Sequence, residues 1–147
     1  MKRVIISDLH IGSAYCKEEE LLQFLNGLEC DELILAGDIV DFVKVPIFSE
    51  YSMDILHRMA SFPSVVYIIG NHDFSFDAFA GKELNQIRFM EEYVFTDSGR
   101  AFRVEHNEEI KTYVNTGDWV EHMTYVTVVD GIVRLKNFKK ELDKDHI

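Results

Sequence analysis

Cysteine and proline are scarce in this sequence, and each shortage argues against a class of protein. Its 147 residues include two cysteines, Cys16 and Cys30, which stand at opposite ends of a predicted helix and in no CxxC spacing. This pattern argues against a zinc-binding or redox motif, and both thiols are expected to be reduced, as in the cytoplasm. Two prolines in a chain that is 47% hydrophobic argue against a disordered segment.

Basic residues and long apolar runs are also few. The chain has 15 Lys and Arg against 26 Asp and Glu, a formal net charge of −11. So acidic a chain repels phosphate backbones, and nucleic acid is not expected as a partner. No apolar run reaches transmembrane length, and the strand pattern that begins at Lys2 leaves no room for a signal peptide. These features predict a cytoplasmic protein without a transmembrane segment.

The order of the expected elements predicts one α/β domain over residues 1–147. Apolar, β-branched runs predict strands at 2–7, 32–36 and 64–69, and helical spacing predicts helices at 17–28, within 39–60 and at 82–92. Shorter strands are expected at about 93–96, 101–105, 110–115, 123–129 and 132–136, followed by a charged tail from Lys139. This order predicts mostly parallel pairing in the first half and antiparallel hairpins in the second.

Three short motifs follow the first three predicted strands. They are Asp8-Leu9-His10, Gly37-Asp38-Ile39-Val40-Asp41 and Gly70-Asn71-His72-Asp73. Each motif alone would be an ordinary turn or cap, and an acidic surplus alone would serve solubility. Because sites in α/β sheets form beyond the carboxyl ends of the strands, the repeated placement favours a shared metal site.

The residue types in these motifs suit hard-metal chemistry. Asp8 and His10, two residues apart, can turn a carboxylate and an imidazole toward one cation, and Asn71 offers an amide oxygen. Asp38 has two carboxylate oxygens and can bridge two metals. Two metals about 3.5–4 Å apart can clamp a phosphoryl group and activate a bridging hydroxide.

The last residues of the motifs predict supporting and catalytic roles. His72 is expected to project beside the metal site, and Asp73 can fix its tautomer. Asp41 and Asp73 are interpreted as supporting residues and not as direct ligands. The motif pattern therefore predicts both a metal site and a histidine placed for proton transfer.

The motifs DxH, GDxxD and GNHD resemble those of the calcineurin-like metallophosphoesterases. The stretch YVNTGDWVE at 113–121 and the opening SDLHIG at 7–12 look like those of the UDP-2,3-diacylglucosamine hydrolases. The resemblance covers roughly residues 2–136. It implies an α/β fold, a four-layer αββα sandwich that is incomplete here. It also implies a dinuclear site, which usually holds two Mn²⁺ ions; Fe²⁺ and Zn²⁺ are alternatives.

The resemblance also implies individual roles. The first motif would bind one metal, and the carboxylate of the second motif would be shared by both metals. The third motif would supply the amide ligand and the histidine that contacts the scissile phosphate. A later family histidine at a strand end is usually followed by glycine, and His106 fits its place, although Asn107 follows it; the alternative is a turn histidine in a hairpin. The implied metal ligands are Asp8, His10, Asp38, Asn71 and His106, and the implied catalytic residues are His72 and Asp73.

One family motif is missing. GHxH, which supplies a histidine to each metal, should follow the His106 strand, where this chain has only residues 107–114 before the NTGDW stretch. His122 comes later, at a place where the family has no ligand. The turn Asn107-Glu108-Glu109 lacks the glycine of tight hairpins, which favours an incomplete junction at about 107–110. Three explanations of the missing motif remain open: a stretch omitted between two joined segments, an internal deletion, and a natural loss of these ligands.

The predicted function is metal-dependent hydrolysis of a small-molecule phosphoester. A metal-activated hydroxide would attack phosphorus in a phosphodiester, a phosphomonoester or a nucleotide-sugar pyrophosphate, and His72 would assist the leaving group. The alternative is a catalytically impaired binding module that keeps the metallophosphoesterase scaffold and docks a partner. The missing GHxH motif is the reason for keeping this alternative.

Overall fold

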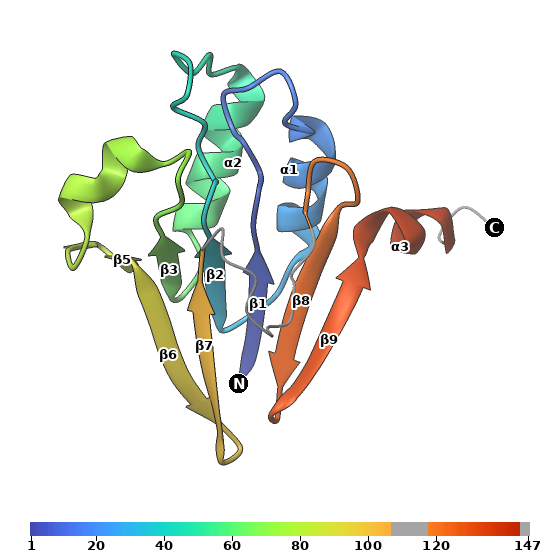
Figure 1. Ribbon diagram of the computed structural model, residues 1–147. Coiled ribbons are helices and arrows are strands. Elements are labelled where there is room, and N and C mark those ends of the chain that lie inside the picture. Colours follow the sequence, from blue (N-terminus) through green and yellow to red (C-terminus); the bar gives the residue numbers. More distant parts are fainter. Residues whose placement is uncertain (107–117, 145–147) are drawn as a thin grey trace.

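The computed structural model describes residues 1–106 and 118–144. The chain forms a mixed α/β fold in which helices cover one face of a large sheet and a hairpin covers the other (Figure 1). Its elements are β1 (Lys2–Ile6), α1 (Glu18–Gly27), β2 (Glu32–Ala36), α2 (Glu50–Ala60), β3 (Val65–Ile68), the 3-10 helix η1 (Phe74–Phe79), β4 (Glu83–Leu84), β5 (Ile87–Met90), β6 (Glu92–Asp97), β7 (Arg100–Glu105), β8 (Thr124–Val129), β9 (Ile132–Asn137) and α3 (Phe138–Lys144).

The large sheet has seven strands in the order β4-β5-β3-β2-β1-β8-β9. Strands β1, β2, β3 and β5 pair in parallel, and β8 and β9 extend the β1 edge by antiparallel pairing. Strands β6 and β7 form a separate antiparallel hairpin. The expected change from parallel pairing in the first half to antiparallel hairpins in the second is therefore confirmed.

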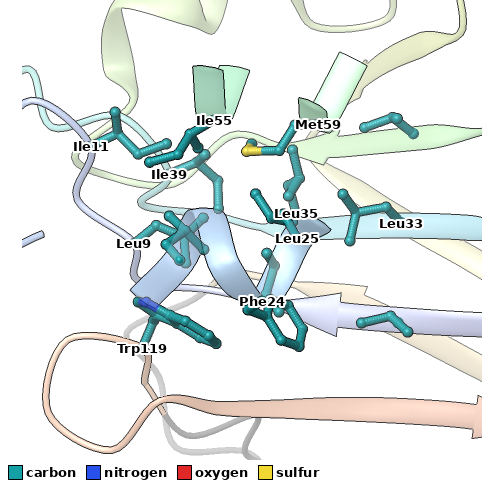
Figure 2. Close-up of a cluster of buried hydrophobic side chains, with 14 of the residues drawn as sticks. Leu9, Ile11, Phe24, Leu25, Leu33, Leu35, Ile39, Ile55, Met59 and Trp119 are labelled. Carbon is teal, nitrogen blue, oxygen red and sulfur yellow. The ribbon is translucent and has the colours of Figure 1, made fainter. Parts of the chain in front are cut away.

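Successive side chains of a strand point to opposite faces of the sheet, and this divides the core into two clusters. Val4 and Ile6 of β1 face α1 and α2, whereas Ile5 between them faces the hairpin, where Phe95 of β6 is buried. Figure 2 shows the helix-side cluster, in which Trp119 is fully buried beside Phe24 of α1 at 4.9 Å between ring centroids. Helices, seven-stranded sheet and hairpin are the layers of the described chain, consistent with the expected incomplete αββα sandwich.

One expectation about secondary structure is wrong. The helix expected at 82–92 is replaced by β4, β5 and the start of β6, because Asn85 turns the chain with φ +52° and β5 then pairs in parallel with the edge of β3. Residues 139–144 of the charged tail expected from Lys139 lie in α3, which runs from Phe138 to Lys144. The strand expected at 110–115 and the junction expected at 107–110 lie outside the described residues. In the described ranges, no helix has the length and hydrophobicity to cross a bilayer.

Candidate metal centre

The candidate site lies where four strands end at one edge of the molecule. Strands β1, β2, β3 and β7 all point toward this edge (Figure 1), and the predicted site residues follow within a few residues of the end of each strand. Parallel pairing of β1, β2 and β3 brings their carboxyl ends together, as expected. The fourth strand, β7, belongs to the hairpin and brings His106 to the same place from the other layer.

The loops after β1 and β2 continue the pairing of their strands. The amide of Asp8 donates to the carbonyl of Gly37 at 3.1 Å, and the amide of His10 donates to the carbonyl of Asp38 at 3.0 Å. Asp8, His10 and Asp38 have φ values of +56°, +51° and +53°, a left-handed conformation that most side chains avoid. Such strained backbone is typical of functional sites, and here it turns the side chains away from the pleated alternation of the strands.

Two glycines leave the room that this arrangement needs. A Cβ atom on Gly37, whose φ is +86°, would collide with the imidazole ring of His106. A Cβ atom on Gly70 would collide with the backbone amide and the carboxylate of Asp38. The glycines that begin the second and third motifs therefore let neighbouring ligand loops approach each other.

The first group of donors is formed by Asp8, His10 and Asp38. One ligand atom from each of the three side chains lies within 4.8 Å of the others, which is close enough for them to share one cation. Burial raises the pKa of the Asp8 carboxyl above its ordinary value, and the charge of Asp38 raises it further. A divalent cation would relieve this repulsion, so the donor chemistry and the electrostatics both fit a metal.

The second group of donors is formed by Asp38, Asn71 and His106. The Nε2 atom of His106 lies 2.9 Å from Oδ1 of Asn71 and 3.3 Å from Oδ2 of Asp38. Its Nδ1 atom lies 3.0 Å from the carbonyl oxygen of Ala36, which can only accept, so Nδ1 carries a proton and Nε2 is the atom aimed at the site. Asp38 thus belongs to both groups, as a bridging ligand must.

Asp38 and His106 also perturb each other's protonation. The hydrogen bond to Asp38 is the main reason that the pKa of His106 is raised to about 9, and burial opposes it. Burial raises the pKa of Asp38, but hydrogen bonds from His106 and from the amide of His72 outweigh it and lower the pKa overall. The metal-free centre therefore carries a proton on His106 that a cation would have to displace.

His72 lies beside the first group and faces a pocket. Its Nδ1 atom lies 3.2 Å from Oδ1 of Asp41, an ion-pair distance without the alignment of a hydrogen bond. The other oxygen of Asp41 lies 3.2 Å from Nδ1 of His10. The pocket has a volume of about 400 Å³ and is lined by Asp8, His10, Tyr15, Asp41, His72, Asp118, Val120 and Glu121.

Asp73 does not have the predicted contact with the ring of His72. Its side chain is fully buried, and its carboxylate accepts hydrogen bonds from the amides of Val40 and Gly70 and from the hydroxyl of Tyr67. The expectation that Asp73 fixes the tautomer of His72 is therefore wrong, because these three donors hold it inside the core. Asp41 lies next to His72 instead. Asp41 is the second aspartate of the GDxxD motif, and this motif was the sequence signal that could have predicted the contact.

A further acidic group lies at the rim of the pocket. Asp118 accepts hydrogen bonds from the amides of Glu121 and His122 and lies 2.7 Å from Nδ1 of His122. These three residues could also hold a cation, but Glu121 and His122 are exposed and the group shares no residue with the two groups above. His122 therefore lies outside the candidate centre, as expected from its place in the sequence after the NTGDW stretch.

The fold and the paired donor groups define a metal-dependent phosphoesterase site on an α/β sheet. The family model described as calcineurin-like phosphoesterase matches residues 1–146, and the chain belongs to this family. The family implies a divalent-metal-dependent hydrolase of phosphoester bonds. A search of curated proteins found no match to this chain.

Proposed function

We propose that this chain, as a single domain over residues 1–147, hydrolyses a small-molecule phosphoester with two divalent cations. The observation that carries this proposal is the shared position of Asp38. Its carboxylate contributes to the group with Asp8 and His10, and its Oδ2 atom lies 3.3 Å from His106 in the other group. A carboxylate between two sets of donors is the arrangement that a two-metal phosphoesterase requires.

We assign the ligands by these groups. Asp8, His10 and Asp38 would hold one cation, and Asp38, Asn71 and His106 would hold the other. Carboxylate, imidazole and amide donors suit Mn²⁺, and they also suit Fe²⁺ and Zn²⁺. Each set has three protein ligands and would leave room for a phosphoryl group and water. The residues present therefore fit the cofactor that the family implies.

The chemistry divides between the cations and His72. When bound, the cations would supply Lewis-acid activation of the phosphoryl oxygens and of the attacking water. Asp41, at 3.2 Å from Nδ1 of His72, would hold the ring so that Nε2 faces the pocket. From Nε2, His72 would give a proton to the leaving oxygen as its bond to phosphorus breaks. Asp73 would support the site only through the backbone of the loops.

For the substrate, we propose a phosphodiester, a phosphomonoester or a nucleotide-sugar pyrophosphate. A pocket of about 400 Å³ beside His72 has the size of a small-molecule site. The similarity of the SDLHIG and NTGDW stretches to UDP-2,3-diacylglucosamine hydrolases favours the pyrophosphate within this range. We also propose a cytoplasmic location and no nucleic-acid partner, in keeping with the scarce cysteines and the net charge of −11.

Hydrolysis of a generic aryl phosphodiester with added Mn²⁺ tests this function. The wild-type chain is expected to turn over, and Asp38→Ala is expected to lose both turnover and Mn²⁺ binding, because both donor groups lose their shared ligand. Asp54→Ala is the control, since Asp54 is exposed on α2 and carries the same charge. Absence of turnover at any metal loading, or equal turnover in Asp38→Ala, would contradict the proposal.

A second candidate function is a binding module on the same scaffold. The missing GHxH motif favours it, because the two donor groups then lack a histidine each. This alternative predicts weak or absent Mn²⁺ binding in calorimetry and no turnover. A wild-type chain whose Mn²⁺ binding disappears in Asp38→Ala and which turns over the aryl phosphodiester would exclude it.

A further inference from the structure

The buried contacts of Asp73 connect the two loops that carry the proposed ligands Asp38 and Asn71. Its Oδ1 atom accepts from the amide of Val40 at 2.7 Å and from the hydroxyl of Tyr67 at 2.8 Å, and its Oδ2 atom accepts from the amide of Gly70 at 3.0 Å. The donors come from the loop after β2, from β3 itself and from the turn after β3. One carboxylate thus joins three segments that meet at the site.

Tyr67 is the side chain on which this junction depends. It is 5% exposed, and its ring packs against Phe76 and Phe89 at centroid distances of 5.5 and 5.3 Å. The ring is held on the helix side of the sheet, so its hydroxyl has a fixed position toward Asp73. Among the described contacts of Asp73, the Tyr67 hydroxyl is the only side-chain donor, because the other two donors are backbone amides.

The junction sets the spacing between ligands. Val40 stands two residues after Asp38, and Asp73 stands two residues after Asn71, so the hydrogen bond between them fixes the two loops beside each other. The amide of His72 donates to Oδ1 of Asp38 at 2.8 Å and completes the connection. A small displacement of either loop would change the distance between the Asp38 carboxylate and the Asn71 amide.

We propose that Tyr67 is a positioning residue of the metal centre: through Asp73 it holds the Asp38 loop and the Asn71 turn at the spacing that bound cations need. This inference rests on the proposed function, since it requires that the centre binds metal. It assigns no direct contact with metal or substrate to Tyr67. Its effect is transmitted by the hydrogen bond to Asp73, in the way that outer contacts orient ligands in metal sites generally.

Tyr67→Phe tests this inference, because it removes only the hydroxyl and keeps the ring packing. We expect the affinity for Co²⁺, followed by its visible absorption, to fall roughly 10–100-fold, with a changed absorption spectrum. Tyr125→Phe is the matched control: Tyr125 is also buried in the helix-side core, but its hydroxyl donates at 3.0 Å to Glu141 of α3. Neither residue lines the pocket or belongs to a donor group. The Tyr125→Phe variant should keep the wild-type affinity and spectrum.

Asp73→Asn separates transmission through Asp73 from a general loss of structure. If Tyr67 acts through Asp73, the losses of Co²⁺ affinity in Tyr67→Phe and Asp73→Asn are non-additive in the double variant. Wild-type affinity in Tyr67→Phe, an equal loss in Tyr125→Phe, or fully additive losses would overturn the inference. A wild-type chain that binds no Co²⁺ would overturn the proposed function, and the inference with it.

Discussion

Single residues at the candidate centre adopt conformations that the rest of the chain mostly avoids. Asp8, His10 and Asp38 all have positive φ, and each is a proposed ligand. A left-handed residue that is not glycine costs free energy, on the order of 1–3 kcal/mol when the surroundings enforce it. The hydrogen bonds between the loops after β1 and β2 enforce it here. Substitutions that keep the side chain's shape are therefore the cleanest way to test single roles.

Replacing His72 by glutamine separates proton transfer from metal binding. If His72 protonates the leaving group, His72→Gln should lower kcat about 10²–10⁴-fold and leave the Kd for Mn²⁺ unchanged. Turnover of the aryl phosphodiester and Mn²⁺ calorimetry measure the two quantities. His57→Gln is the control, because His57 is exposed on α2. A comparable loss of Mn²⁺ affinity in His72→Gln would identify His72 as a metal ligand instead.

The pKa of His106 predicts how metal affinity depends on pH. Without metal the pKa is raised to about 9, mainly by the hydrogen bond to Asp38, so His106 is protonated at pH 7. A cation bound at Nε2 must displace this proton, and the affinity should rise about tenfold per pH unit until pH approaches 9. Mn²⁺ calorimetry between pH 6.5 and 8 measures the slope. In His106→Ala the slope should flatten; an unchanged slope would assign the proton to another group.

At the level of elements, the sequence predicted the parts that depend on local pattern. Apolar runs before Asp8, Asp38 and Asn71 predicted three buried strands, and parallel pairing then brought the motifs together. The helix expected at 82–92 failed because strand pairing with β3 outweighed local helical spacing. The partner of His72 was missed for a similar reason: adjacency in sequence suggested Asp73, whereas packing buries Asp73 and places Asp41 there.

The close approach of the loops predicts that one methyl group disrupts the centre. In Gly70→Ala the new Cβ would collide with the amide and carboxylate of Asp38, so Mn²⁺ affinity should fall at least tenfold. Gly27→Ala is the matched control, because a Cβ there meets nothing within 4 Å at the end of α1. It should keep the Mn²⁺ affinity and leave the free energy of unfolding unchanged or slightly raised. Wild-type affinity in Gly70→Ala would show that the loops can move apart without cost.

For the molecule as a whole, the position of His106 depends on how the hairpin is attached to the sheet. The hairpin packs on Ile5 and its neighbours through Phe95, and charged residues support it at the end of the sheet opposite the site. There Arg3 is paired with Glu32 and with Asp97 of β6, both at 3.0 Å. The layer that supplies the last proposed ligand is thus fixed at one end by ion pairs and at the other by the site itself.

Glu32 holds this attachment together, and its substitution should destabilise the whole fold. Its side chain is 5% exposed and accepts from Arg3, Arg88 of β5 and Tyr93 of β6. Glu32→Gln would leave the buried guanidinium group of Arg3, and the partly exposed one of Arg88, with less compensation. The loss at Arg3 is the larger part of an expected cost of roughly 3–5 kcal/mol of unfolding free energy.

Urea unfolding measures this loss, with Glu92→Gln as the matched control. Glu92 lies on the same hairpin and pairs with Arg103, but both side chains are about half exposed, so its loss should cost less than about 1 kcal/mol. Equal destabilisation by the two variants would mean that burial does not strengthen the Glu32 contacts. A Glu32→Gln chain that stays folded in dilute buffer should also bind Mn²⁺ more weakly, because the hairpin that positions His106 has lost its attachment.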